Sequence, residues 1–174
     1  GEKLLLAVIA AYETMIRLSW SCSPHLIYRG HHPPVGVGPF GGAAAGSVIM
    51  GFDKEHALNA LGIAGSHSAG LIEYTKTGGS VKRMHAGIPA QAGVRATMFA
   101  NAGITGPESI IEGEKGFCKV FAVDYDLSRL TDGLGDTWHM LDNGLKPYSC
   151  CHLIHAALGA LDEARGKQVF APED

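Results

Sequence analysis

The sequence has few charged side chains and no excess of basic ones. Asp, Glu, Lys and Arg make up 18% of the 174 residues, and the formal net charge at pH 7 is -3. Proteins that bind nucleic acid usually carry a positive net charge or a basic patch on one face. The slightly negative net charge of this chain does not fit that pattern, so we expect no nucleic-acid partner.

Cysteine is scarce as well, and its spacing matches neither a disulfide framework nor a paired zinc site. The four cysteines are Cys22, Cys118, Cys150 and Cys151. Adjacent cysteines are poorly placed to bond each other, and secreted disulfide-rich domains show a denser pattern. Cys150 and Cys151 stand near His152 and His155, but structural zinc sites combine two separated ligand pairs. We therefore expect a cytoplasmic protein with reduced thiols, core or rim packing for this cluster, and no bound metal.

Long hydrophobic runs are missing too. No eighteen consecutive residues are apolar, whereas a membrane-spanning helix needs about that many. The N-terminal stretch GEKLLLAVIAAYETMIRLSW includes Glu13 and continues in a helical pattern, unlike a cleavable leader. We expect no contact with a membrane. Because the sequence does not begin with Met, we also expect it to be a fragment of a longer gene product.

Small and apolar residues dominate the chain, and their spacing predicts helices. Residues 3–19 carry apolar side chains at helical spacing and on most other sides, so we expect a helix buried against several partners. Prolines and glycines break regular helix over 21–34, and a glycine-rich segment becomes helical near Gly41. Asp53 then occupies the N-cap of a helix that fades near Gly70.

The helical pattern continues until the composition changes near Gly116. Pro89, which is tolerated in a first helical turn, begins a helix that runs to about Ala102, and a short helix is predicted over 107–111. After Gly116, the segment FCKVFAV has β-propensity. Residues 138–141 are predicted to form a second short strand before an Asn-Gly turn.

The C-terminal part alternates between turn, extended and helical segments. Residues 127–135 are predicted to be a short helix or turn, and Pro147 disfavours helix at the residue before it. Residues 152–164 return to helix. The change from helical to mixed sequence patterns near Gly116 is a candidate domain boundary. It separates a mainly α part, residues 1–115, from a part with both helix and strand, residues 116–174. The predicted inner face of the last helix consists of Leu153, Ala156, Ala157, Ala160 and Leu161.

The loop GGSVKRMHAG, residues 78–87, offers the most chemistry. It holds Lys82, Arg83 and His85 within four positions and has glycines at both ends. Three cationic or titratable side chains between flexible hinges, set in an apolar body, suit the capture of an anionic substrate. The alternatives are a surface loop with a solvated Lys-Arg pair and, for His85, a structural histidine bonded within the loop.

Three further positions carry candidate groups. A histidine followed by two prolines, as in RGHHPPVGVG at His31 and His32, can be held rigidly at a helix entrance and suits proton transfer near neutral pH. The alternative is an exposed histidine pair. Pro147 fixes the backbone beside Lys146 and helps to aim its side chain, although this lysine could equally be solvated at a strand edge. His67 is predicted to be a hydrogen-bonded helix histidine.

Residues 62–121 resemble the MmgE/PrpD family. The matching pieces are AGS-x-x-x-GL, the turn KRMHAG, a small-residue helix that ends in AGITGP, and the run EGEKGF, in that order. Weaker matches extend over nearly the whole chain. The resemblance implies a mainly α fold, in which residues 1–115 form the central part of a helical domain. Residues 116–174 would then begin a smaller α+β domain that closes over the active site and is truncated here.

Members of this family include 2-methylcitrate dehydratase, cis-aconitate decarboxylase and iminodisuccinate epimerase. The resemblance implies a cofactor-independent lyase, a dehydratase or decarboxylase, that acts on a citrate-like di- or tricarboxylate and forms a homodimer. A role in propionate metabolism is implied in the same way. The choice between these activities depends on pocket shape. The alternatives are an epimerase on an amino-dicarboxylate, or a catalytically incomplete fragment that serves as a packing or dimerisation module.

The resemblance also implies roles for particular residues. His32 would act as base or acid, and Lys82 and Lys146 would hold carboxylates or developing charge. His31 is then an ordinary neighbour. The expected substrate-binding residues are Arg83, His85 and Tyr148. Because the family has further active-site groups in an Asp-Thr-His region N-terminal to this stretch, we expect the chain alone to hold only part of the site.

Overall fold

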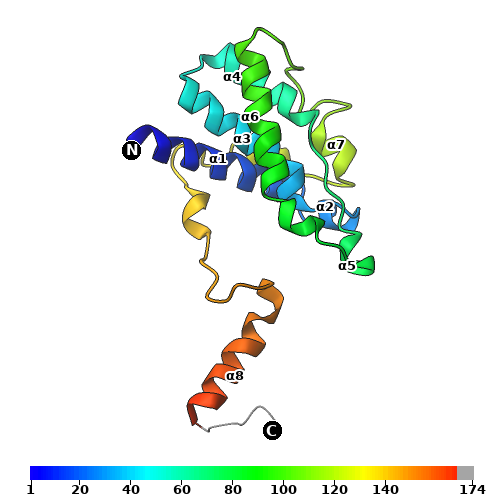
Figure 1. The fold of residues 1–174 in the computed structure, drawn as a ribbon. Helices are drawn as coiled ribbons and strands as arrows, with labels where there is room; N and C mark the ends of the chain where they lie inside the picture. Colours follow the sequence, from blue (N-terminus) through cyan, green and yellow to red (C-terminus); the bar gives the residue numbers. More distant parts are fainter. Residues whose placement is uncertain (168–174) are drawn as a thin grey trace. The chain divides into compact units, whose positions relative to one another are not determined.

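The computed structural model describes residues 1–167 and contains helices but no strand over that range. The chain divides into two compact units, Gly1–Leu141 and a second that begins at Asp142 (Figure 1). The prediction of a mainly α protein is confirmed. The predicted domain boundary after residue 115 stays a prediction.

The first unit contains long helices joined by short helical turns. In chain order these are α1 (Glu2–Ser21), α2 (His25–Tyr28), α3 (Pro33–Met50), α4 (Lys54–Gly65), α5 (Tyr74–Thr77), η1 (Val81–Met84), α6 (Gly87–Asn101), α7 (Phe117–Phe121) and η2 (Leu127–Leu130). A last 3₁₀ turn, η3 (His139–Asp142), ends at the first residue of the second unit.

Helix α3 lies at the centre of the first unit, between α1 and α6, and α4 packs on both α3 and α6 (Figure 1). Glycines allow the close approach of α3 and α6. A Cβ atom placed on Gly93 would lie 2.5 Å from the Cα of Gly42, and one on Gly38 would lie 2.6 Å from the Cβ of Pro89. The two helices therefore touch through their backbones, which larger residues would prevent.

The core forms where these helices meet α7. Its largest buried side chain is Phe40, whose ring packs edge-on against Phe117 with the centroids 5.4 Å apart. Phe117 in turn stacks on Phe121 at 4.9 Å. Aromatic pairs of this kind stabilise a fold beyond the area they bury. Smaller side chains complete the core and include Leu18, Leu26, Ala43, Ala60, Ala64 and Ala96.

Helix α3 begins earlier than the sequence predicts, at Pro33 instead of near Gly41. Proline fits the first turn because the N–H that it lacks would have no partner there. The following glycines stay helical because α6 and the core surround them, and this packing outweighs their low helix propensity. The helix ends at Gly51, whose φ of 69° places it in the left-handed region.

Two other helix predictions are confirmed. Asp53 caps α4, because its carboxylate accepts a hydrogen bond of 2.9 Å from the backbone N–H of His56. This helix ends at Gly65, before the predicted end. The helix predicted from Pro89 is α6, which starts two residues earlier at Gly87. Gly103 follows it with φ +86°.

The strand predictions are wrong. FCKVF forms helix α7, which places Phe117 and Cys118 in the core, and residues 138–141 contain the 3₁₀ turn η3. Burial of one side of a short helix thus overrides β-propensity. Residues 107–111 form turns instead of the predicted helix, although the predicted helix or turn after residue 126 is confirmed as η2.

Helix α1 confirms the helix predicted over 3–19, but its burial was overestimated. Leu4, Leu5 and Leu6 are each more than half exposed, at 61%, 65% and 52%. By length and composition the helix could cross a membrane, a property that it shares with core helices of soluble proteins and with signal sequences. Its C-terminal half packs in the core instead, through Leu18 and its neighbours.

A buried ion pair fixes the segment after η2 to α1. Arg17 Nε donates to Glu13 Oε2 at 3.1 Å, and its other nitrogens donate to the carbonyls of Asp132 and Thr137 at 2.7 and 2.9 Å. Glu13 Oε1 accepts from the backbone N–H of Met140 at 2.8 Å. Each charge is therefore paired and further hydrogen-bonded, which a buried charge requires.

The second unit contains η4 (His152–Ile154) and α8 (His155–Lys167), so the helix predicted over 152–164 is confirmed. The inner face predicted for this helix is wrong for this unit. All five of its side chains are exposed, and Leu153 is 90% exposed. Tyr148 donates a hydrogen bond of 2.7 Å to Asp162 Oδ2, which joins the segment before η4 to α8.

Candidate functional site

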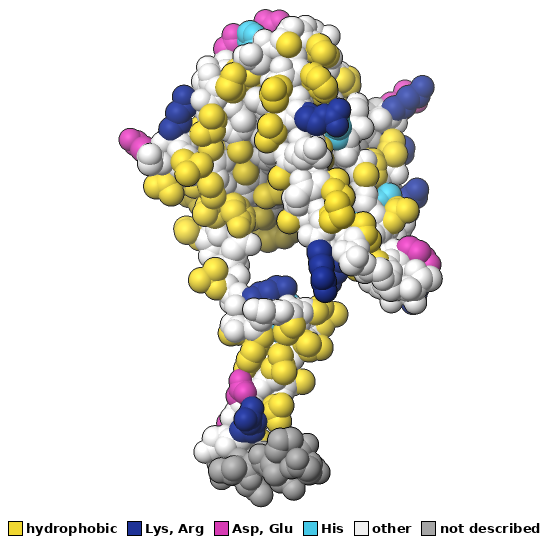
Figure 2. Space-filling model, viewed as in Figure 1, with side chains coloured by type: hydrophobic (Ala, Val, Ile, Leu, Met, Phe, Trp, Pro, Cys, Tyr) yellow, Lys and Arg dark blue, Asp and Glu magenta, His cyan; other side chains and the backbone are white. Residues whose placement is uncertain are grey.

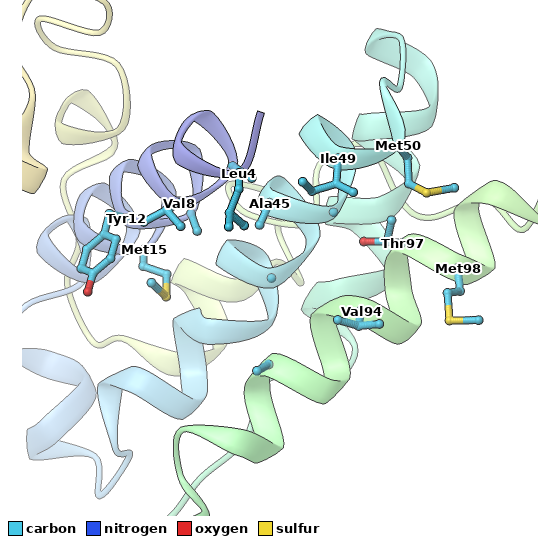
Figure 3. A pocket seen from close by; sticks show the side chains of 15 residues that line it. Leu4, Val8, Tyr12, Met15, Ala45, Ile49, Met50, Val94, Thr97 and Met98 are labelled. Atoms are coloured by element: carbon cyan, nitrogen blue, oxygen red, sulfur yellow. The ribbon is translucent and has the colours of Figure 1, made fainter. Parts of the chain in front are cut away.

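A hollow in the first unit lies between α1, α3 and α6 and has a volume of about 510 Å³. Figure 2 shows hydrophobic side chains around it, and Figure 3 shows those that line it. The labelled aliphatic and sulfur-containing residues are Leu4, Val8, Met15, Ala45, Ile49, Met50, Val94 and Met98. None of the lining residues is acidic, basic or a histidine. The hollow therefore offers no charged group to a carboxylate, and its polar side chains are Tyr12 and Thr97.

The titratable side chains cluster instead where α3 and α6 begin. Two histidines contact each other there. His32 is the N-cap residue of α3, and His85 directly follows η1 at the entrance to α6. Their Nδ1 atoms lie 2.8 Å apart and form a hydrogen bond. His85 is only 5% exposed, and His32 is half-buried. The two interpretations of His85 from the sequence, a substrate-binding residue and a structural histidine, both stay predictions.

Backbone pairing holds His32 in place. Its N–H donates to the carbonyl of Gly70 at 3.1 Å, and the N–H of Ile72 donates to the carbonyl of Gly30 at 3.0 Å. The two prolines that follow His32 start α3 at once. The ring is therefore fixed on one side by a helix and on the other by the 70–72 segment, as the sequence predicted for a histidine before Pro-Pro.

Tyr74 is a member of the cluster that sequence reasoning missed. Its ring centroid lies 5.9 Å from that of His32 and 5.4 Å from that of His85, edge-on in both cases. Lys82 Nζ lies 5.7 Å from the Tyr74 centroid, a cation–π distance. The available signal was its place in GLIEYTKTGG, between two of the pieces that resemble the MmgE/PrpD family.

Burial is the main influence on the charge of His32. It lowers the pKa of His32, and the positive charges that His85 and Lys82 can carry lower that pKa further. A pKa below the ordinary value keeps the imidazole neutral at pH 7, so that it can accept a proton. The ammonium group of Lys82, which is solvent-exposed, remains available to an anion.

The predicted site residues thus fall into two groups. His32, Lys82 and His85 come together in the first unit, while Arg83 is exposed on η1 and makes no ion pair within the described residues. Lys146 and Tyr148 belong to the second unit. Lys146 Nζ donates to the carbonyl of Cys150 at 3.1 Å.

The bond from the Tyr148 hydroxyl to Asp162, described with the second unit, raises the pKa of Tyr148. Tyr148 also packs edge-on against His155, with the ring centroids 5.4 Å apart. The catalytic role predicted for Lys146 and the substrate contact predicted for Tyr148 stay predictions.

The remaining histidines have other surroundings. His31 packs on Phe121 with centroids 4.7 Å apart, and burial lowers its pKa. The hydrogen bond predicted for His67 is confirmed, because its ring bonds to the carbonyl of Ile63 at 3.1 Å, but its predicted place in a helix is wrong, because α4 ends at Gly65. His155 packs against His152, but no group of three possible metal ligands occurs within the described part of the chain. That the protein binds no metal stays a prediction.

The first unit is thus a helical domain. It places the imidazoles of His32 and His85 and the ammonium group of Lys82 where α3 and α6 begin. Residues 1–130 match the family model of the MmgE/PrpD N-terminal domain. The match covers most of the chain, and the chain belongs to the MmgE/PrpD family. The resemblance found in the sequence is confirmed.

Curated relatives carry the name cis-aconitate decarboxylase. The one from Aspergillus terreus is 29% identical over 175 residues, which cover 96% of this chain and 36% of the relative. The one from Mus musculus is 35% identical over 123 residues, which cover 70% of this chain and 25% of the relative. A human relative of the same name is 32% identical with the same coverage. The chain spans about a third, or less, of the length of these relatives.

Proposed function

We propose that the full-length protein is a lyase that acts on a citrate-like di- or tricarboxylate without a cofactor. The reaction we favour is decarboxylation of cis-aconitate, because the relatives from Aspergillus terreus, Mus musculus and Homo sapiens carry that name. Dehydration of 2-methylcitrate is the alternative that the family resemblance leaves open. We also propose, from the resemblance, that the protein is a cytoplasmic homodimer.

The observation that carries the proposal is the bonded pair His32 and His85 beside Lys82. Decarboxylation breaks a carbon–carbon bond, releases carbon dioxide and leaves an electron pair that spreads toward a neighbouring carboxylate. A lysine ammonium stabilises that charge, and an imidazole N–H delivers the proton that the carbon then requires. The cluster contains both kinds of group.

Other residues have supporting roles in the proposal. Lys146 would hold a substrate carboxylate or developing charge, and Arg83 and Tyr148 would contact substrate carboxylates. Arginine and lysine suit this purpose because their N–H groups bind carboxylate oxygens through charge-assisted hydrogen bonds. These three assignments rest on the family resemblance.

The test is turnover by the longest natural form of the protein. Purified protein is offered cis-aconitate, 2-methylcitrate and citrate in turn, and products and carbon dioxide are measured. We expect cis-aconitate to lose carbon dioxide, and we expect Lys82→Ala to reduce kcat/KM about 100-fold or more at an unchanged melting temperature. The matched control is Lys76→Ala, an exposed lysine on neighbouring α5.

Two results would change the proposal. Dehydration of 2-methylcitrate without release of carbon dioxide would replace the decarboxylase with a dehydratase. Equal activity of the Lys82→Ala and Lys76→Ala proteins would remove Lys82 from the reaction.

A further inference from the structure

The contact between His32 and His85 restricts where their protons can be. Their Nδ1 atoms are 2.8 Å apart, which is a hydrogen-bond distance. Such a bond requires a proton on one Nδ1 and a lone pair on the other. Two protonated nitrogens would repel each other, and so would two bare ones. The pair therefore holds one proton between its rings.

This shared proton decides the state of the outer nitrogens. In a neutral imidazole only one nitrogen carries a proton. The ring that donates through Nδ1 has a bare Nε2, which is a base. The ring that accepts at Nδ1 has a protonated Nε2, which is an acid. A neutral pair thus presents one acidic and one basic Nε2 at the same time, on two different rings.

We infer that His32 and His85 form a two-histidine relay, in which a proton enters at one Nε2 and leaves from the other. The inference takes its substrate from the proposed function, but its geometry stands alone. When the bare Nε2 gains a proton, the shared proton moves across to the second Nδ1, and the second Nε2 can then release its own. Each ring gains one proton and loses one, so no co-reactant is needed.

The surroundings of the pair favour such a relay. His85 is 5% exposed, so water seldom competes for the bond between the rings. The backbone N–H of His85 donates to the carbonyl of Lys82 at 3.2 Å, and Tyr74 packs on both rings. Neither Nε2 has a hydrogen-bond partner within the described residues. The ring nitrogens that are buried without a hydrogen-bond partner belong to other residues, His31 and His155.

Lys82 and Tyr74 are the charged and titratable groups that face the pair. The positive charge of Lys82 opposes a second charge on the rings, and the shared bond accommodates one added proton without breaking.

The direct test is the state of the ring nitrogens in the longest natural form of the protein, labelled with ¹⁵N in histidine and observed by NMR. At about pH 8, above the usual histidine pKa, we expect one ring of the pair to carry its proton on Nδ1 and the other on Nε2. In the His85→Ala protein, Nδ1 of His32 has no imidazole partner, so the signal of the bond between the two Nδ1 atoms should disappear. Two Nε2–H rings that titrate independently would overturn the relay.

Turnover gives a second test that a purely structural role would not pass. We expect His85→Ala to lower kcat about 100-fold. His85→Asn can still form a hydrogen bond with His32, as donor or acceptor, but cannot pass a proton on, so this variant should lose one limb of the pH profile. His67→Ala, a half-buried histidine outside the cluster, is the control and should leave kcat unchanged. An unaltered pH profile in His85→Asn would overturn the relay.

The two tests separate this inference from the proposed function. One Nδ1–H ring and one Nε2–H ring in a protein that turns over no carboxylate would support the shared proton and defeat the lyase proposal. Turnover of cis-aconitate by a protein whose two rings titrate independently would support the lyase and defeat the relay.

Discussion

At the scale of single residues, the environment of each histidine sets its charge, and the charge affects stability. Burial is the largest cause that lowers the pKa of both His31 and His32 from the ordinary value of 6.5. Unfolding returns both rings to water and to that ordinary value. The folded state therefore binds fewer protons than the unfolded state once the pH falls below about 6.5.

The first prediction concerns this pH dependence. The free energy of unfolding should decrease as the pH falls from about 6.5 toward the lower pKa values of the folded state, and then level off for these two groups. Urea unfolding at a series of pH values measures it. His31→Gln and His32→Gln should each flatten the decrease. A decrease of the same slope in all proteins would contradict the assignment.

The second prediction concerns the buried pair of Glu13 and Arg17. Removing one partner leaves an uncompensated charge, so Arg17→Met should lower the free energy of unfolding by about 3–5 kcal/mol. The exposed pair of Asp126 and Arg129 is the matched control, and Arg129→Met should cost about 1 kcal/mol or less. Equal losses in the two variants, measured by urea unfolding, would show that the buried pair contributes no more than a surface one.

Much of the site could be predicted at this scale, and its geometry could not. His32, Lys82 and His85 stand out because titratable side chains between glycines and prolines are uncommon in so apolar a chain. The bond between His32 and His85 joins residues 53 positions apart and depends on how α3 and α6 pack. Tyr74 escaped notice for the same reason, since nothing local marks a tyrosine as the neighbour of two distant rings.

At the scale of elements, periodicity predicted the long helices and failed where burial competes with propensity. Helices α1, α4 and α6 follow apolar spacing, an N-cap and an early proline. The sequence FCKVF has β-branched and aromatic residues but forms α7, because two of its side chains fill the core beside Phe40. A pattern five residues long cannot tell a buried strand from a buried helix.

The third prediction concerns the contact between α3 and α6. A Cβ on Gly93 would lie 2.5 Å from the Cα of Gly42, and backbone atoms cannot turn aside as a side chain can. Gly93→Ala should lower the free energy of unfolding by about 1–3 kcal/mol. Gly87→Ala, in the same helix with open space around the added methyl group, should be neutral or slightly stabilising. Thermal unfolding compares the two, and similar melting temperatures would argue against tight contact.

At the scale of the whole molecule, the chain is one part of a longer family architecture. It matches the MmgE/PrpD N-terminal domain over residues 1–130 and spans 36% of the Aspergillus terreus relative. The exposed leucines at the start of α1 and the apolar hollow beside them lie on the same helical unit. The histidine pair lies where α3 and α6 begin, and neither histidine lines the hollow, so the two are separate features.

The fourth prediction concerns ligand binding by this chain. If the cluster binds a carboxylate in the folded state alone, the ligand stabilises that state by about 2.7 kcal/mol at a hundredfold excess over Kd. We expect one citrate-like anion among a panel of di- and tricarboxylates to raise the melting temperature. Lys82→Met should abolish the rise, whereas Lys76→Met should retain it. No rise with any anion would indicate that binding needs groups outside this chain.

The glycine contact between α3 and α6 has a consequence for the geometry of the site. Gly38 touches Pro89 close to where both helices begin, and the two histidines stand at those beginnings. The distance between the rings is therefore set by residues that take no part in the chemistry. A hydrogen bond weakens over a few tenths of an ångström, less than the width of one methyl group. One added methyl group at Gly38 would therefore suffice to break the bond between the rings, while every titratable side chain stayed in the sequence.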